Sequence, residues 1–277
     1  MVDSWWLKLE RAKDHQADIV REARWYSQNH PYRISRARSR GQQPWRYQIQ
    51  MTEQPDQRVA LLFGDFIHSL RSALDHVVYA CVPPKERSQA AFPIESVDPW
   101  KRDSRRRFAI RDPEIRKRFL RQISGIDPEA EEIIRELQPF RRPNPSTSTI
   151  GIIGRLDNAD KHRRIIAFGS GIEEPTLIRV FPDGTSLSET RRTFGREYYE
   201  DGSEIYSVDD LPAWLNGHED VEVRCSATSV IAIRIEGGGR ATTRSHFRLL
   251  STMDSAVLEV GNVLALLEPF VRLSSNT

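Results

Sequence analysis

The sequence predicts an α+β fold in which a helical bundle carries an inserted antiparallel β-sheet. Apolar residues recur at helical spacing near both ends of the chain and in its middle, which predicts long helices there. Short β-branched and aromatic runs, separated by turns such as PDGT, EDGS and EGGG, precede the last helix. We expect a single α+β domain over residues 1–277, with its helical core at 1–30, 57–164 and 247–272 and its β portion at 31–56 and 165–246.

Two helices and a hairpin are predicted at the start of the chain. Residues 4–29 have apolar side chains at helical spacing, Ser4 is a candidate N-cap, and His30-Pro31 ends the helix. The alternating stretches YRISRAR and WRYQIQM flank the loop SRGQQP, which predicts a β-hairpin. Residues 57–82 are predicted as a helix that ends before Pro83-Pro84, and its apolar stripe consists of positions 63, 66, 67, 70, 74, 77, 78 and 81.

The remaining elements surround a predicted sheet. Residues 98–124 form a very basic helical stretch, and a second Asp-Pro-Glu sequence predicts a short helix over 127–140. Residues 149–165 are predicted as the next helix, and the stretch AFPIES before them as extended. Six short runs between 165 and 245 predict the antiparallel sheet. Residues 251–273 predict a long helix that is apolar enough to be buried on most sides.

The composition is that of a soluble globular protein, with 38% hydrophobic and 29% charged residues. No apolar run reaches the ~18 residues of a membrane span, and the N-terminus lacks the pattern of a signal peptide. Cys81 and Cys225 stand far apart, so a structural zinc site is unsupported, and the expected compartment is the cytoplasm. We expect no cofactor, no bound metal and no membrane partner.

One face of the helix predicted at 57–82 collects short polar side chains around the stretch HSLRSALDH. At 100° per residue, the residues opposite the apolar stripe are Asp65, His68, Ser72, Asp75 and His76, with Arg71 at the margin. A solvated face usually carries Lys, Glu and Gln, and this face has none. Two explanations stay open: a buried polar network around the i, i+4 pair Arg71–Asp75, or a functional site that lines a cleft.

A second polar cluster lies in the sequence RLDNADKHRR. Its members are Asp157, Asn158, Asp160, Lys161, His162, Arg163 and Arg164. In a helix, Asp157, Lys161 and Arg164 share one side, and Asn158 and His162 share another. The charges are typical of a solvated surface. The stripe of Asn158 and His162 is less typical, and it can meet the 57–82 helix and add a third histidine to its polar face.

Three kinds of chemistry fit these groups. Metal binding needs several converging His, Asp or Glu ligands, and neither an HExxH nor a paired Glu-x-x-His motif is present. Hydrolysis by a serine nucleophile is unsupported because the GxSxG elbow is missing. Acid–base cleavage of RNA needs a histidine that transfers protons near neutral pH and an arginine that stabilises charge on the phosphoryl group. His76 and Arg71 supply both without a metal.

The ordered motifs GDFIHSLRSALDHVVYA, FPI, LQPF and LDNADKHRRI resemble a family of uncharacterised bacterial proteins. The pair Arg71-x4-His76 is also similar to the Arg-x4–6-His motif of HEPN domains, which are helical, often dimeric and in many cases metal-independent ribonucleases. This resemblance implies that Arg71 stabilises the phosphate, that His76 is the acid–base group, and that two copies meet at a dimer interface. His68 and Asp75 beside them complete the candidate catalytic set.

Arginine dominates the basic residues, with 35 Arg against 6 Lys. This ratio is typical of a GC-rich genome or of phosphate recognition by the guanidinium fork. Residues 101–122 hold ten basic and three acidic residues. Their candidate RNA-binding side chains are Arg105, Arg106, Arg107, Arg116, Arg118 and Arg121, with Phe108 and Phe119 available for stacking. Alternatively, the arginines are solvated while Ile110, Ile115, Phe119 and Leu120 pack inward.

Two functions remain as hypotheses. The first is a cytoplasmic HEPN-like protein that binds RNA or cleaves it without a metal, in defence or toxin action, as a homodimer. The second is a non-enzymatic interaction protein in which the His/Asp/Arg face is a buried structural network and the sheet contacts a protein partner.

Overall fold

The computed structural model describes residues 3–29, 31–37, 46–100, 113–162, 165–180, 185–190, 199–206, 223–235 and 247–272. Its α-helices are α1 (Ser4–Gln28), α2 (Arg58–Cys81), α3 (Pro113–Gln122), α4 (Pro128–Glu136), α5 (Thr149–His162) and α6 (Leu249–Leu267). Short 3-10 helices are η1 (Pro84–Gln89), η2 (Pro139–Arg141) and η5 (Glu268–Phe270). The predicted α+β class is confirmed, because the antiparallel strands are inserted after α1 and after α5 in a mainly helical chain.

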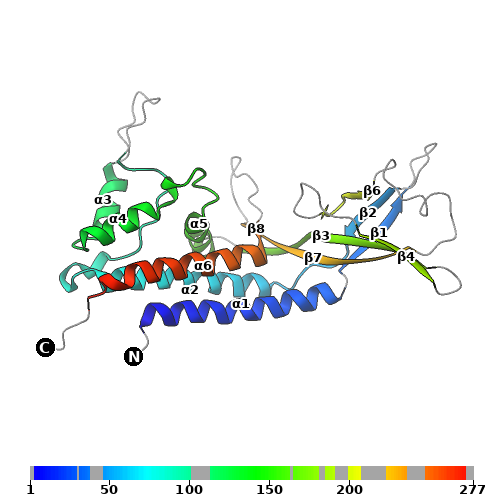
Figure 1. Ribbon diagram of the computed structural model, residues 1–277, viewed down its shortest axis with the longest axis horizontal. Coiled ribbons are helices and arrows are strands. Elements are labelled where there is room, and N and C mark those ends of the chain that lie inside the picture. The colour runs from blue at the N-terminus through cyan, green and yellow to red at the C-terminus, as the bar shows by residue number, and fades with distance from the viewer. Residues whose placement is uncertain are drawn as a thin grey trace, which may run out of the picture.

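Three long helices, α1, α2 and α6, run side by side along the long axis of the molecule (Figure 1). Trp6 Nε1 donates to Glu268 Oε1 at 2.8 Å, and Gln16 Nε2 donates to Asp254 Oδ1 at 2.7 Å. The start of α1 thus lies beside the end of α6, and the middle of α1 lies beside the start of α6, so these two helices are antiparallel. The helices α3 and α4 lie at the end of the bundle that holds both termini, and the strands lie at the other end.

The central helix α2 forms as predicted and ends directly before Val82-Pro83. The predicted apolar stripe is completely buried: Phe63, Phe66, Ile67, Leu70, Leu74, Val77, Val78 and Cys81. Fully burying one such aliphatic or aromatic side chain stabilises a fold by about 1.5–3 kcal/mol. This stripe therefore fixes the rotation of α2 about its axis, and that rotation determines where its polar side chains lie.

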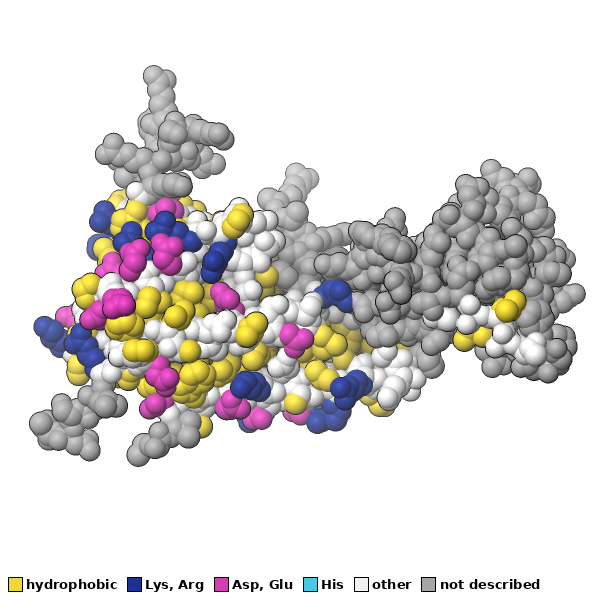
Figure 2. Space-filling view, in the orientation of Figure 1, with side chains coloured by type: hydrophobic (Ala, Val, Ile, Leu, Met, Phe, Trp, Pro, Cys, Tyr) yellow, Lys and Arg dark blue, Asp and Glu magenta, His cyan; other side chains and the backbone are white. Residues whose placement is uncertain are grey.

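The last helix is the most apolar of the bundle. The segment Leu249–Phe270 is long and apolar enough to cross a membrane, and it is the one helix of the described residues with this property. It packs against α1, α2 and α5, but only 33% of its most apolar window is buried. The expectation that this helix is buried on most sides is therefore wrong, because one face of it has no neighbour among the described residues. Leu250, Leu258 and Leu266 remain exposed on it. Hydrophobic side chains also gather over the helical part of the molecule in Figure 2.

The strands form two sheets, and both are antiparallel, as predicted. Some strands are longer than the short β-branched runs from which they were predicted. The first sheet orders β1 (Tyr32–Ala37), β2 (Arg46–Met51) and β6 (Glu204–Tyr206), and its β1–β2 pair is the predicted hairpin. The second has β4 (Ser186–Thr190), β3 (Ile165–Val180), β7 (Val223–Ile235) and β8 (Phe247–Arg248), with β5 (Tyr199–Glu200) on β3. Register shifts at Gly169/Gly171 and Glu173/Thr176 let β3 pair with β7 over most of its length.

The helices and the second sheet meet where α1 ends. The Tyr26 hydroxyl donates to the Glu53 carbonyl at 2.9 Å, and burial together with Glu53 and Asp201 raises the pKa of Tyr26 to about 12. A Cβ atom at Gly169 would overlap the Tyr26 hydroxyl oxygen, so only glycine allows this close approach. The Gly169 amide also donates to Gln54 Oε1 at 3.1 Å, which ties β3 to the segment before α2.

Several element boundaries differ from the sequence prediction, and two of the differences have a clear local cause. Within the helical stretch predicted at 98–124, residues 98–100 form a turn, the helix starts at Pro113, and 101–112 lie outside the described residues. Asp98 Oδ1 accepts a hydrogen bond from the Trp100 amide at 2.9 Å, and this aspartate turn around Pro99 replaces the helix. Phe247 and Arg248, which the prediction placed in the helical core 247–272, extend the sheet by pairing with β7. The last helix therefore begins at Leu249.

Candidate functional site

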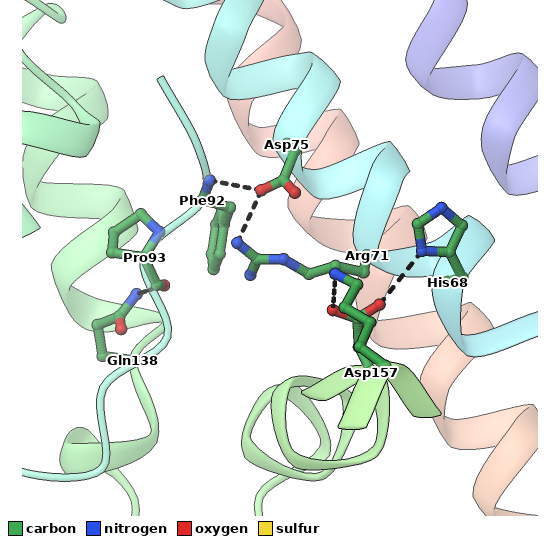
Figure 3. A network of polar contacts seen from close by, with 8 residues as sticks. His68, Arg71, Asp75, Phe92, Pro93, Gln138 and Asp157 are labelled. Carbon is green, nitrogen blue, oxygen red and sulfur yellow. Dashed lines mark hydrogen bonds and ion pairs between the residues drawn. The ribbon is translucent and has the colours of Figure 1, made fainter. Parts of the chain in front are cut away.

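The predicted polar face of α2 contacts three different neighbours. His68 meets α5, Arg71 and Asp75 meet the irregular segment 91–95, and His76 meets the start of α1. The first two contacts are drawn in Figure 3. His68, Asp75 and His76 are therefore bonded to three different elements, and of these three only Asp75 and His76 line a common pocket.

Arg71 and Asp75 form the i, i+4 pair that the sequence predicted. The Arg71 Nη2 and Asp75 Oδ1 atoms are 2.8 Å apart, and 15% of the Arg71 side chain is exposed. The same carboxylate oxygen accepts the Phe92 amide at 2.9 Å. Burial raises the pKa of Asp75, while Arg71 and the Phe92 amide oppose that shift. The pair thus holds segment 91–95 against α2, and its arginine is already neutralised.

Gln138 extends this network and was not among the predicted site residues. Its side chain is completely buried after α4. Its Nε2 donates to the Pro93 carbonyl at 2.9 Å and to the Ile134 carbonyl at 3.0 Å, and its Oε1 accepts the Glu95 amide at 3.0 Å. The sequence motifs LRSALDH, FPI and LQPF consequently meet in one place, around the backbone of residues 92–95 (Figure 3).

The second cluster contacts α2 through its aspartates. Asp157 is buried and accepts Lys161 at 2.7 Å, and its Oδ1 lies 3.3 Å from His68 Nδ1. A Cβ at Gly64 would lie 2.5 Å from Asp160 Oδ1, so α5 approaches α2 over this glycine. Burial, with Asp157 and Asp65 nearby, raises the pKa of Asp160.

The predicted stripe of Asn158 and His162 does not carry this contact. Both side chains are exposed, and they lie 100° or more around α5 from the buried Asp157. The prediction that His162 adds a third histidine to the polar face of α2 is therefore wrong. No group of three or more His, Cys, Asp or Glu side chains that could hold a metal occurs within the described part of the chain.

His76 lines a pocket of about 570 Å³ at the end of the bundle. The pocket lies between the start of α1, the end of α2, η1 and the residues after η5. His76 Nδ1 is 3.1 Å from the Ser4 hydroxyl. Burial and the nearby Lys8 lower the pKa of His76, against an opposing effect of Asp75. A neutral imidazole near pH 7 is the form that accepts a proton.

Two arginines that the sequence did not single out line the same pocket. Arg87 Nε donates to the Val82 carbonyl at 3.1 Å, and Arg272 Nη2 donates to the Gly125 carbonyl at 3.0 Å. Among the described residues, neither guanidinium forms an ion pair with a carboxylate. They are 185 positions apart in the chain, and no local motif marks either one, so only the packing of η1 beside the chain end brings them together.

The arginine belt is only partly described. Arg105, Arg106 and Arg107 lie outside the described residues. Arg118 forms an ion pair with Glu95 at 2.6 Å and so anchors α3 to segment 91–95, whereas Arg116 lies 6.0 Å from the Trp100 ring centroid. Arg121 is exposed.

The alternative prediction, that the apolar side chains of this helix pack inward, holds for some of the described residues only. Phe119 is buried, Ile115 is partly buried, and Leu120 is 38% exposed. Ile110 lies outside the described residues. The loop after α3 accepts the hydrogen bond from Arg272 through Gly125, so the basic helix ends beside the pocket.

No protein-family model matches this chain, and no curated protein or solved structure is significantly similar to it. The argument for function therefore rests on the geometry and chemistry of the residues described above.

Proposed function

We propose that the protein binds RNA and cleaves it without a metal, with His76 as the proton-transfer group. The observation that carries this proposal is the pocket in which a histidine of lowered pKa stands with Arg87 and Arg272. These two arginines take the phosphate-binding role that the HEPN-like motif assigned to Arg71. The guanidinium of Arg71 is bonded to Asp75 and mostly buried, and is thereby unsuited to a substrate.

The reaction needs only the substrate and these side chains. When Nδ1–H of His76 donates to Ser4, the Nε2 lone pair takes the proton from a ribose 2′-hydroxyl. O2′ then attacks phosphorus, the P–O5′ bond breaks, and O5′ leaves with a proton returned by the imidazolium. The arginines donate to the non-bridging oxygens, where negative charge develops. The products are a 2′,3′-cyclic phosphate and a 5′-hydroxyl.

The exposed cations of α3 supply the sequence-independent part of RNA binding in this proposal. Arg116 and Arg121 have no carboxylate partner among the described residues, and α3 ends next to the pocket. Contacts between arginine and phosphate release counterions, so we expect affinity to fall steeply as salt is raised. We place the activity in the cytoplasm, where the free, buried thiol of Cys81 stays reduced.

Incubation of the purified protein with end-labelled single-stranded RNA in excess EDTA tests this function. We expect cleavage to persist in EDTA and the new 3′ ends to carry cyclic phosphate. His76→Ala protein, purified in parallel, controls for contaminating nucleases. RNA that stays intact with the wild type, or equal cleavage by both proteins, would refute the proposed ribonuclease.

The alternative is a non-enzymatic interaction protein, in which a complex with a protein partner is the functional form. The observation that favours it is the Arg71–Asp75 pair, which already has a structural task. Replacing Arg71 by alanine is expected to lower the free energy of unfolding by about 1–4 kcal/mol, because a half-buried carboxylate loses its cation. Urea unfolding measures this change, and an unaltered midpoint contradicts the structural role.

A further inference from the structure

The pocket beside His76 contains a preformed stack of an aromatic ring and a guanidinium group. Tyr79 lines the pocket and is 48% exposed. The Arg87 Cζ atom lies over its ring at 4.8 Å from the centroid. Because Arg87 Nε is also bonded to the Val82 carbonyl, the guanidinium plane is held by two contacts. Its Nη atoms have no partner among the described residues.

Such a stack is a surface that nucleobases bind. Bases that are not paired stack on tyrosine rings and on guanidinium planes in protein–RNA complexes. The same arginine also donates hydrogen bonds to base or phosphate oxygens. The rest of the wall includes the apolar side chains of Ala80, Ala90 and Val271, which suit the faces and edges of a base.

The volume of the pocket limits what enters it. About 570 Å³ lies in the range of sites for single small ligands, between about 300 and 1,000 Å³. A base in a duplex is covered on both faces by its neighbours and must leave the stack before it can enter such a site. Asp75 also lines the pocket, and a carboxylate can accept a hydrogen bond from a ribose hydroxyl or an exocyclic amino group.

We infer that the pocket receives one unpaired nucleotide, whose base stacks against the Tyr79–Arg87 pair while its phosphate lies between Arg272 and His76. This inference rests on the proposed function and makes it more specific, because it names single-stranded RNA as the substrate and Tyr79 as the residue that recognises the base. Arg87 then contributes to both base stacking and phosphate binding.

Calorimetric titration tests the base contact without any cleavage. The probes are the four ribonucleoside 5′-monophosphates, ribose 5-phosphate and inorganic phosphate. For the wild type, the best nucleotide is expected to bind about 5- to 150-fold more tightly than ribose 5-phosphate, the range for stacking of one base on an aromatic ring. Tyr79→Leu is expected to abolish this difference, and Tyr79→Phe is expected to keep it. Because Tyr79 is half exposed, both variants retain the core.

Each outcome separates this inference from the proposed function. Equal affinities for nucleotides and ribose 5-phosphate, no binding of any probe, or full nucleotide affinity in Tyr79→Leu would overturn the base contact even if RNA is cleaved. If nucleotide binding depends on Tyr79 but the protein leaves RNA intact, the inferred nucleotide site stands and the proposed ribonuclease function is overturned. Cleavage of a hairpin stem as fast as its loop would contradict the requirement for an unpaired nucleotide.

Discussion

Replacement of His76 by alanine is expected to slow RNA cleavage by about 10²- to 10⁴-fold, the usual contribution of a positioned general acid–base group. Binding of RNA is expected to change little, since Arg87, Arg272 and the α3 arginines remain in place. Single-turnover cleavage of end-labelled RNA and an equilibrium binding assay in the same buffer separate these two effects. The matched control is His162→Ala, which removes an exposed histidine of α5 that does not line the pocket.

The pH dependence of cleavage gives a second, independent signature of His76. The imidazole acts as a base only when neutral, so the rate falls as pH drops through the pKa of His76. Because burial and Lys8 lower that pKa, the midpoint is expected below the ordinary value of 6.5. Cleavage is thus expected to reach its plateau before neutral pH. A midpoint above 6.5, or an unchanged rate in His76→Ala, would exclude His76 as the base.

The helix that holds His76 was predictable because its signal is local. Eight apolar positions at helical spacing specify both the existence of α2 and the face that it buries. The same periodicity predicted the polar face and the Arg71–Asp75 pair, since i, i+4 neighbours depend on the helix alone.

What contacts that face was not predictable, because it depends on elements far away in the chain. Arg71 and His76 are five residues apart, yet Arg71 pairs with Asp75, which holds segment 91–95, and His76 meets α1. A motif that lists both residues cannot show that they face different neighbours. Gln138, Arg87 and Arg272 were missed for the same reason, as each acquires its role only when distant segments pack together.

Replacement of Gln138 by alanine is expected to lower the free energy of unfolding by about 2–5 kcal/mol. The amide side chain satisfies three buried backbone groups: the carbonyls of Pro93 and Ile134 and the amide of Glu95. Each buried polar group left without a partner costs about 1–3 kcal/mol, and water that enters the new cavity recovers part of this. Ile134 lies in the last turn of α4, so the change also leaves its carbonyl without the side-chain donor, while the backbone bonds to the Ile133 and Arg135 carbonyls remain.

Urea unfolding followed by circular dichroism measures this loss, with Gln57→Ala as the control at an exposed position before α2. Gln138→Glu is a sharper test than alanine, because it keeps the shape and the acceptor for Glu95 but places an oxygen against the carbonyls of Pro93 and Ile134. It is therefore expected to be at least as destabilising as alanine at neutral pH, and to recover stability when acid protonates the carboxylate. If both variants unfold at the same urea concentration as the wild type, Asp75 and Arg118 hold segment 91–95 without Gln138. The motif LQPF then has another role.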